Sequence, residues 1–97
     1  MPRYITLVHW TDQGIRDVKV TLQRGEQVRT MTREMGGDLH TLYWTQGRYD
    51  LVAVADAPDD ATIAAITLRI GTAGNVRTEV LRAFDAEEMG RILAKVS

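Results

Sequence analysis

The sequence predicts an α+β fold in which one antiparallel β-sheet is covered on one face by helices. Segments rich in β-branched and aromatic residues alternate with segments whose apolar residues recur every three to four positions. Their order along the chain is strand, helix, strand, strand, helix, strand, with one further helix at the end. Because the chain has 97 residues, 44% of them hydrophobic, we expect one domain over residues 1–97.

Four segments are expected to form strands. The first is dominated by β-branched and aromatic residues and is followed by a turn at residues 11–14. Gln46-Gly47 separates the second strand from the third and predicts a tight hairpin turn, because glycine accepts a positive φ without strain. The expected strands cover residues 3–10, 38–45, 49–57 and 75–84.

The first helix is expected over residues 15–35. Its apolar stripe is interrupted at Gly25, and a glycine weakens a helix interior by about 1 kcal/mol relative to alanine. The β-branched residues at positions 18, 20 and 21 predict an irregular start, with the regular helix beginning near Leu22. Gly36-Gly37 predicts its end.

Two further helices have clear start signals. Pro58-Asp59-Asp60 ends the third strand and offers an N-cap to a helix over residues 61–70. The last helix begins at a capping box formed by Asp85 and Glu88. Its apolar stripe, at helical spacing, consists of Met89, Ile92, Leu93 and Val96.

With right-handed crossovers, this order of elements gives a ferredoxin-like βαββαβ sandwich plus a C-terminal helix, with antiparallel sheet order 4-1-3-2. Successive residues of the third strand, such as Leu51 and Val52, are apolar on both faces, although only one face is covered by helices. A sheet face open to water should be polar. We therefore expect a second copy of the chain to cover the bare face, giving a homodimer or a larger homo-oligomer.

The sheet order also predicts a candidate site, because it places the end of the first strand beside the starts of the third and fourth. Aromatic and polar side chains gather at this rim, as is typical of small-molecule pockets. The candidate catalytic residues are His9 and Asp50. The expected ligand-binding residues are Trp10, Tyr43, Trp44, Tyr49 and Arg77.

Each of these residues also has a structural interpretation. Asp50 could pair with Arg77 or accept hydrogen bonds from loop amides. His9 could be an ordinary half-buried histidine, and Tyr49 a core residue whose hydroxyl bonds to the backbone. The tryptophans could serve packing at a sheet edge or an interface. The sequence leaves both interpretations open.

Composition and charge exclude several classes of protein. Twelve Lys and Arg against 13 Asp and Glu give a net charge of −1, which argues against a nucleic-acid partner. The absence of cysteine excludes thiolate catalysis and disulfides. The two histidines have no carboxylate at ligand spacing and no phosphate-binding loop is present, so we expect neither metal nor cofactor. Without a long apolar segment, we expect no membrane association and a cytoplasmic location.

The run Gly-Arg-Tyr-Asp at residues 47–50 resembles the signature of the GYD domain family. The likeness extends along nearly the whole chain: Thr6 and Trp10-Thr11 are similar to the opening strand of the family, Gly36-Gly37 to its helix stop, and residues 74–78 to the entry of its last strand. The resemblance implies a ferredoxin-like fold and, more distantly, kinship with the dimeric α+β barrel proteins. These include cofactor-independent oxygenases, lactone isomerases, haem-handling enzymes and metabolite-sensing domains, and fold analogy does not choose among them.

Three functions follow from these observations. The first is a small homo-oligomeric protein that binds a small, partly aromatic metabolite in a pocket of the sandwich. The second is a cofactor-independent oxygenase or isomerase, in which His9 or Asp50 moves a proton while Tyr49 or Arg77 stabilises an oxyanion. The third is a purely structural, self-assembling protein. Whether the chain is an enzyme stays open.

Overall fold

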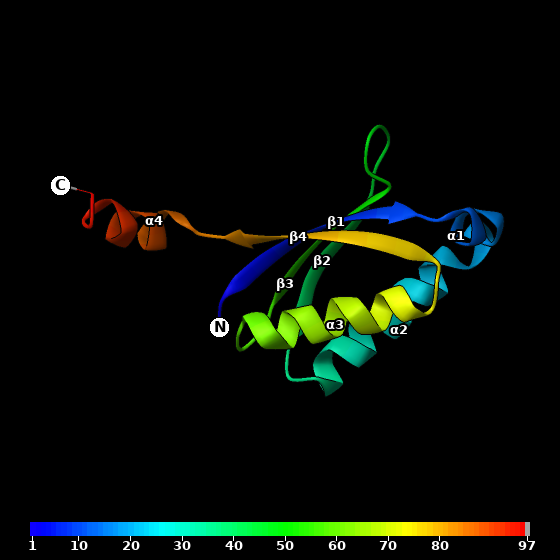
Figure 1. Ribbon diagram of the computed structural model, residues 1–97, viewed down its shortest axis with the longest axis horizontal. Helices are drawn as coiled ribbons and strands as arrows, with labels where there is room; N and C mark the ends of the chain where they lie inside the picture. The colour runs from blue at the N-terminus through cyan, green and yellow to red at the C-terminus, as the bar shows by residue number, and fades with distance from the viewer. Residues whose placement is uncertain (97) are drawn as a thin grey trace.

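The structure of the chain is a computed structural model that describes residues 1–96. Four strands form a single sheet, and the helices between them carry the chain from one strand to the next (Figure 1). The elements are β1 (Arg3–Trp10), α1 (Asp12–Arg16), the 3-10 helix η1 (Val18–Val20), α2 (Thr21–Glu34), β2 (Asp38–Trp44), β3 (Leu51–Asp56), α3 (Asp60–Thr72), β4 (Val76–Ala83) and α4 (Ala86–Leu93).

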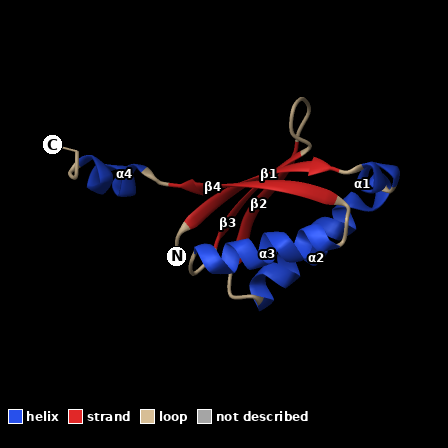
Figure 2. Cartoon of the chain, viewed as in Figure 1, coloured by secondary structure: helices blue, strands red, loops and turns tan. Residues whose placement is uncertain are grey.

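The strand order across the sheet is β2-β3-β1-β4, and every neighbouring pair is antiparallel. This is the predicted order 4-1-3-2 read from the other edge. Helices α2 and α3 lie together on one face of the sheet, while no element of the described chain covers the other face (Figure 2). The ferredoxin-like α+β sandwich predicted from the sequence is therefore confirmed.

The two faces of the sheet are set by the alternation of side chains along β1. Thr6 and Val8 face the helices and are buried, and their register partners Ala53 and Leu51 share that face. Ile5 and Leu7 point to the opposite side. We call this second side the open face; its apolar residues are Ile5, Leu7, Val52, Val54, Leu81 and Ala83.

The tightest packing lies at one end of the sandwich. Tyr4, Ala57, Ile63 and Ile66 form a cluster of buried side chains, and parts of α2 and β4 pack around it. The Tyr4 hydroxyl donates a hydrogen bond of 2.5 Å to the Asp60 carboxylate, so the polar tip of this buried ring is satisfied at the start of α3. This contact fixes α3 on the sheet.

The connection between β1 and α2 differs from the sequence prediction. The sequence predicts a turn at residues 11–14, but α1 begins at Asp12, and the Thr11 hydroxyl caps it by accepting a hydrogen bond from the Gly14 amide. The predicted irregular start of the next helix is confirmed, because η1 precedes α2, which begins at Thr21. Gly36, with φ +91°, ends α2 as predicted.

The hairpin between β2 and β3 is longer than predicted. Gly47 has the expected positive φ of +102°, but β3 begins at Leu51, so Tyr49 and Asp50 lie in the loop and not on the strand. The loop closes through the Thr45 amide, which donates to the Asp50 carbonyl at 2.8 Å. The predicted hairpin is therefore present, but its connection is longer than the tight turn predicted at Gln46-Gly47.

Both predicted helix caps are present. The Asp59 carboxylate accepts hydrogen bonds from the hydroxyl and the backbone amide of Thr62, and these bonds lower the pKa of Asp59. Asp85 and Glu88 form a complete capping box at the start of α4.

Helix α4 projects away from the sandwich at the end of β4 (Figure 1). It makes the molecule long, with extents of 51 × 31 × 18 Å. Met89 and Leu93 of its apolar stripe are exposed, as is Phe84 just before it. No helix within residues 1–96 combines the length and apolar character needed to span a bilayer.

Candidate functional site

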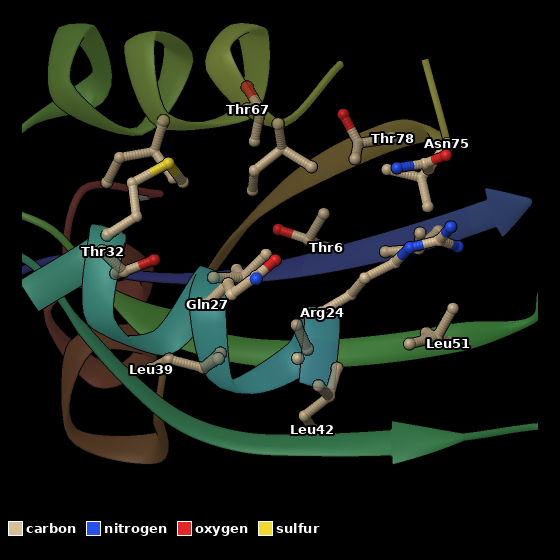
Figure 3. A pocket seen from close by; sticks show the side chains of 18 of the residues that line it. Thr6, Arg24, Gln27, Thr32, Leu39, Leu42, Leu51, Thr67, Asn75 and Thr78 are labelled. Atoms are coloured by element: carbon tan, nitrogen blue, oxygen red, sulfur yellow. The ribbon is translucent and has the colours of Figure 1, made fainter. Parts of the chain in front are cut away.

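A cavity of about 420 Å³ lies between the sheet and the two helices that cover it. Its floor is the helix-facing side of the sheet, with Thr6 of β1 near the centre, and its walls are α2 and α3 (Figure 3). Val8 of β1 also lines the floor. Most of the exposed wall is apolar. Its volume falls within the range of roughly 300–1,000 Å³ typical of small-molecule pockets.

Gly25 explains how one wall of this cavity is built. A Cβ atom at this position would lie 3.0 Å from Cδ2 of Leu42 and 3.7 Å from the Trp44 ring, so the glycine lets α2 lie close against β2. The Trp44 indole N–H donates to the Thr21 hydroxyl at 2.9 Å and ties the end of β2 to the start of α2. The gap in the apolar stripe was the sequence signal of this close approach.

A β-bulge decides which residues of β2 face the cavity. The pairing register of β2 with β3 shifts between Leu39 and Thr41. As a result, Leu39 pairs with Ala55 and Leu42 pairs with Ala53, and both pairs face the cavity. Trp44 also faces this side. Strict alternation from Leu39 would place Tyr43 there instead, and the bulge was not visible in the sequence.

Uncharged polar groups such as Thr6 and Thr32 are spread along the cavity, while its charged groups gather at one end. Figure 3 shows Arg24 of α2 and Asn75, which precedes β4, at this end. Trp10 of β1, which pairs with Val76 next to Asn75, also lines the cavity. The Arg24 guanidinium donates to the Gly14 carbonyl at 3.2 Å and lies 3.7 Å from the Asp17 carboxylate. Gln13 donates to the Asn75 side chain, which leaves the Asn75 amide N–H groups available.

The seven candidate residues predicted from the sequence lie at or near neighbouring strand ends, but they are divided between the two sides of the sheet. Trp10 lines the cavity, and Trp44 packs beside it at Gly25. His9, Tyr43 and Arg77 point to the open face, because each is paired or alternates with residues of that side. The candidate bases His9 and Asp50 are not among the residues that line the cavity.

Asp50 forms hydrogen bonds to the backbone of β1. Its carboxylate accepts a hydrogen bond of 2.8 Å from the Trp10 amide, and its own amide donates to the Val8 carbonyl at 2.8 Å. This arrangement agrees with the structural interpretation of Asp50, with a main-chain partner in place of Arg77. The carboxylate supplies an acceptor to β1 just beyond the point where β3 begins.

His9 and Tyr49 form a contact at the edge of the open face. Their rings lie 4.8 Å apart with an interplanar angle of 41°, and the Tyr49 hydroxyl donates to Glu79 of β4 at 3.3 Å. Arg77 is the register partner of His9. Glu79 was missed by the sequence analysis, although its alternation with Arg77 along β4 places both on this face.

A second charged group lies at the other end of the open face. Asp56 accepts hydrogen bonds from Arg3 at 3.0 Å and from His40 at 2.7 Å. Burial raises the pKa of Asp56, but these two hydrogen bonds and the nearby positive charges outweigh it, so the pKa is lowered overall. The hydrogen bond to Asp56 also raises the pKa of Arg3. Nothing in the sequence signalled this cluster, because its members come from three strands.

Within residues 1–96, no group of three or more His, Asp or Glu side chains is placed to hold a metal ion. The side chains that line the cavity offer apolar contact, hydroxyl and amide hydrogen bonds, and the guanidinium groups of Arg24 and Arg69.

Comparison with known protein families identifies the chain. The family model described as the GYD domain matches residues 4–93. The chain belongs to the GYD domain family. The matched segment includes nearly all of the sheet, the cavity and the whole of α4.

One relative of this GYD domain, and one solved structure of similar fold, come from Thermus thermophilus. The chain is 31% identical over 90 residues to a protein named glutamine synthetase and cystathionine beta-lyase binding protein, covering 92% of this chain and 95% of the relative. It also resembles the crystal structure of TTHA0845 from Thermus thermophilus, with a TM-score of 0.58, 24% identity and coverage of 89% and 96% of the two chains. The second comparison supports the fold alone.

Proposed function

We propose that this GYD domain is a homodimeric binding module that holds a small metabolite with an apolar, partly aromatic body in the cavity of the sandwich. The observation that carries the proposal is the cavity itself, about 420 Å³ inside a chain of 97 residues. Protein interiors pack as densely as organic crystals and keep few voids larger than a water molecule. A ligand that fills this apolar space would gain contact that the protein alone does not supply.

The tryptophans of the rim fit this role. Trp10 lines the cavity and offers a flat apolar surface with one donor. Trp44 lies against Gly25 at the cavity wall and is 39% exposed. Tyr43, Tyr49 and Arg77, which point to the open face or its edge, are proposed to serve self-association and not the ligand.

Filling the cavity with a side chain tests the proposal. Ala53 lies in β3 and faces the cavity, so Ala53→Leu would place three more carbon atoms where the ligand is proposed to bind. A panel of small metabolites is screened by thermal shift, because a ligand of the folded state raises Tm by mass action. We expect ligands that stabilise the wild-type protein to lose their effect on Ala53→Leu.

The control is Ala64→Leu, at an exposed position of α3 outside the cavity lining. This variant should respond to the same ligands as the wild-type protein. If no compound of a broad panel stabilises the wild-type protein, or if Ala53→Leu and Ala64→Leu respond alike, the cavity is not a binding site.

The homodimer is proposed on the open face. The centre of this face is apolar, with Ile5, Leu7 and Val54 half-buried in the isolated chain. Its edges carry both signs of charge, for example Arg77 and Glu79 on β4. A twofold interface brings the same patch together from both copies, so a face with an apolar centre and mixed charges at its edges can be complementary to itself.

Sedimentation equilibrium tests the dimer. We expect no detectable monomer at micromolar concentration and a monomer for Leu7→Glu, because a charge at the centre of the face would be buried without a partner. The control Gln23→Glu places the same charge on an exposed position of α2. A folded wild-type monomer at micromolar concentration would rule out the proposed dimer.

A second function is favoured by the relative from Thermus thermophilus, whose name makes it a binding protein for two enzymes. Here the partner would be another protein, and the exposed stripe of α4 offers an apolar surface for it. Titration of the protein with purified glutamine synthetase and with cystathionine beta-lyase tests this function. Binding of either enzyme that survives Ala53→Leu but is lost in Leu93→Glu would support it, and no binding of either would exclude these partners.

A further inference from the structure

The cavity wall carries positive charge only. Among the residues of the described chain that line it, the charged side chains are Arg24 and Arg69, and no Asp or Glu lines it. The chain as a whole has a net charge of −1, so an all-positive wall is not a consequence of a basic composition. The charge of the lining is a local property of the cavity.

Both arginines belong to the same end of the cavity. Arg24 lies near the start of α2 and Arg69 in the last turn of α3. The start of α2 and the end of α3 lie side by side at the end of the sandwich where β1 runs into α1 (Figure 1). Figure 3 shows the Arg24 side chain extending toward Asn75 at this end, with Thr32 at the opposite end.

The opposite end carries no charged side chain and is mostly apolar, with Thr32 as a polar member. Ile63 and Ile66 of α3 are buried there, and Leu39 of β2 is 4% exposed. The cavity therefore has a charged end and an uncharged, mostly apolar end, and a molecule with the same division would suit it.

Arg24 has donors to spare. Its side chain is 23% exposed, and its contacts in the described chain are the Gly14 carbonyl and the distant carboxylate of Asp17. The separation of 3.7 Å from Asp17 is too long for a hydrogen bond, and the Asp17 side chain is 68% exposed to solvent. A guanidinium has five N–H donors in a planar fork that fits the two oxygens of a carboxylate.

We propose that the natural occupant of the cavity is an amphipathic organic acid, with its carboxylate at Arg24 and its apolar body directed toward Ile63 and Ile66. This inference rests on the proposed binding function and adds the chemical class of the ligand. A neutral or cationic ligand of the same shape would leave the partly buried Arg24 guanidinium with only the distant, exposed carboxylate of Asp17 as counter-charge, which is less favourable. Arg69 is proposed to attract the ligand carboxylate electrostatically from the same end of the cavity, without a defined hydrogen bond to it.

Three compounds with one body and different charge test the class directly. Indole-3-acetate, indole-3-acetamide and tryptamine are titrated into the full-length chain labelled with ¹⁵N, and affinities are read from amide shifts. The same comparison is made with octanoate, octanamide and octylamine, in case an aliphatic body fits better. We expect the anion of at least one series to bind about tenfold or more tightly than its amide, the amine to bind most weakly, and added salt to reduce the preference.

Two variants locate the charge that is responsible. Arg24→Gln should bring the affinity for the anion down to that for the amide while leaving the affinity for the amide unchanged. Arg69→Gln, at an exposed position, should reduce the preference by a smaller factor and keeps the test valid if Arg24→Gln loses its contact with Gly14 and fails to fold. The control is Arg33→Gln, an exposed arginine of α2 outside the cavity lining, which should keep the full preference.

The outcomes separate this inference from the proposed function. If the amide binds as tightly as the anion in every series that shifts resonances of cavity residues, the cavity binds ligands but the acid class is wrong. If the amine binds most tightly, the cavity prefers a positively charged ligand and the inference is wrong. If none of the six compounds shifts cavity resonances, the proposed binding function fails and this inference fails with it.

Discussion

Asp50 shows at the scale of one residue how a signature motif can serve the backbone. It follows Tyr49 in the run that resembles the family signature, and in the structure its carboxylate accepts from the Trp10 amide at 2.8 Å. The Trp10 amide lies beyond the last residue of β1 that pairs with β3. Asp50 therefore takes the place of a missing strand partner, and it links the hairpin to the central strand.

Asp50→Ala is expected to lower the free energy of unfolding by about 1–3 kcal/mol, because it leaves the partly buried Trp10 amide without an acceptor. Asp50→Asn keeps an acceptor oxygen in the same place and should cost only a small part of this. Urea unfolding followed by circular dichroism measures both. Equal losses in the two variants would show that the charge of Asp50 matters and not its role as an acceptor.

Tyr4 gives a prediction about pH. Its hydrogen bond to Asp60 raises its pKa to about 12 from the ordinary value of 10.0, and burial and the negative charge of Asp60 act in the same direction. The folded protein thus keeps the neutral phenol at a pH where the unfolded chain has already lost the proton. The stability contributed by this proton is complete below pH 10 and is lost as the pH rises from 10 to about 12.

Measurement of unfolding free energy against pH should therefore show a steeper alkaline fall for the wild-type protein than for Tyr4→Phe. The phenylalanine variant lacks this proton, and every other titrating group is common to both proteins. Parallel curves for the two proteins between pH 10 and 12 would contradict the assignment of the Tyr4–Asp60 hydrogen bond.

The sheet order predicted from the sequence explains why His9 and Trp10 both lie near the β2–β3 hairpin. Their roles in binding or catalysis stay predictions. Residue alternation in the sequence could not give the length of that hairpin or the bulge in β2, because neither has a local signature at these residues. The bulge turns Trp44 toward the helices and Tyr43 toward the open face, which divides the predicted aromatic rim in two.

At the scale of elements, the sequence identified each major strand and helix but missed α1. A five-residue helix has almost no stability of its own, so its existence depends on docking and not on local propensity. Gly14 is the docking point. A Cβ atom there would lie 1.9 Å from the Asn75 carbonyl oxygen, which itself accepts from the Thr11 amide at 3.0 Å.

Gly14→Ala should therefore lower the free energy of unfolding by at least about 2 kcal/mol, because α1 must move off the start of β4. The matched control is Gly71→Ala in α3, where a Cβ atom meets nothing within 4 Å and the higher helix propensity of alanine should raise stability by up to about 1 kcal/mol. Thermal or urea unfolding gives both values. A Gly14→Ala variant as stable as the wild-type protein would mean that α1 is not packed at Asn75.

At the scale of the whole molecule, helices of the described chain cover only one of the two faces of the sheet. Helices α2 and α3 cover one face of the sheet, and α4 projects beyond it (Figure 2). Apolar side chains such as Leu81 on the open face and Leu93 on α4 are exposed. Sequence patterning anticipated the bare sheet face because both faces of β3 are apolar. It also gave the amphipathic character of α4, but not its direction, since nothing in a helix sequence states where its apolar stripe docks.

In the proposed dimer, α4 of one copy is expected to lie against the other copy. Its stripe has too few partners in its own domain, since Leu93 is 57% exposed and the helix extends beyond the sandwich (Figure 1). Burying a leucine contributes about 1.5–3 kcal/mol, and replacing it with a charged residue removes that contribution. Leu93→Glu should therefore raise the dimer dissociation constant by about tenfold or more, with little change in the far-ultraviolet spectrum of the folded chain.

Glu87→Gln, on the solvent-facing part of the same helix, is the control for this last prediction and should leave the dissociation constant unchanged. Analytical ultracentrifugation over a range of concentrations measures both variants beside the wild-type protein. If Leu93→Glu dimerises as well as the wild-type protein, α4 is not part of the interface between copies. Its exposed apolar stripe would then be available to a different protein, as the second proposed function requires. An exposed apolar stripe at the end of a small domain is typical of a surface that a partner covers.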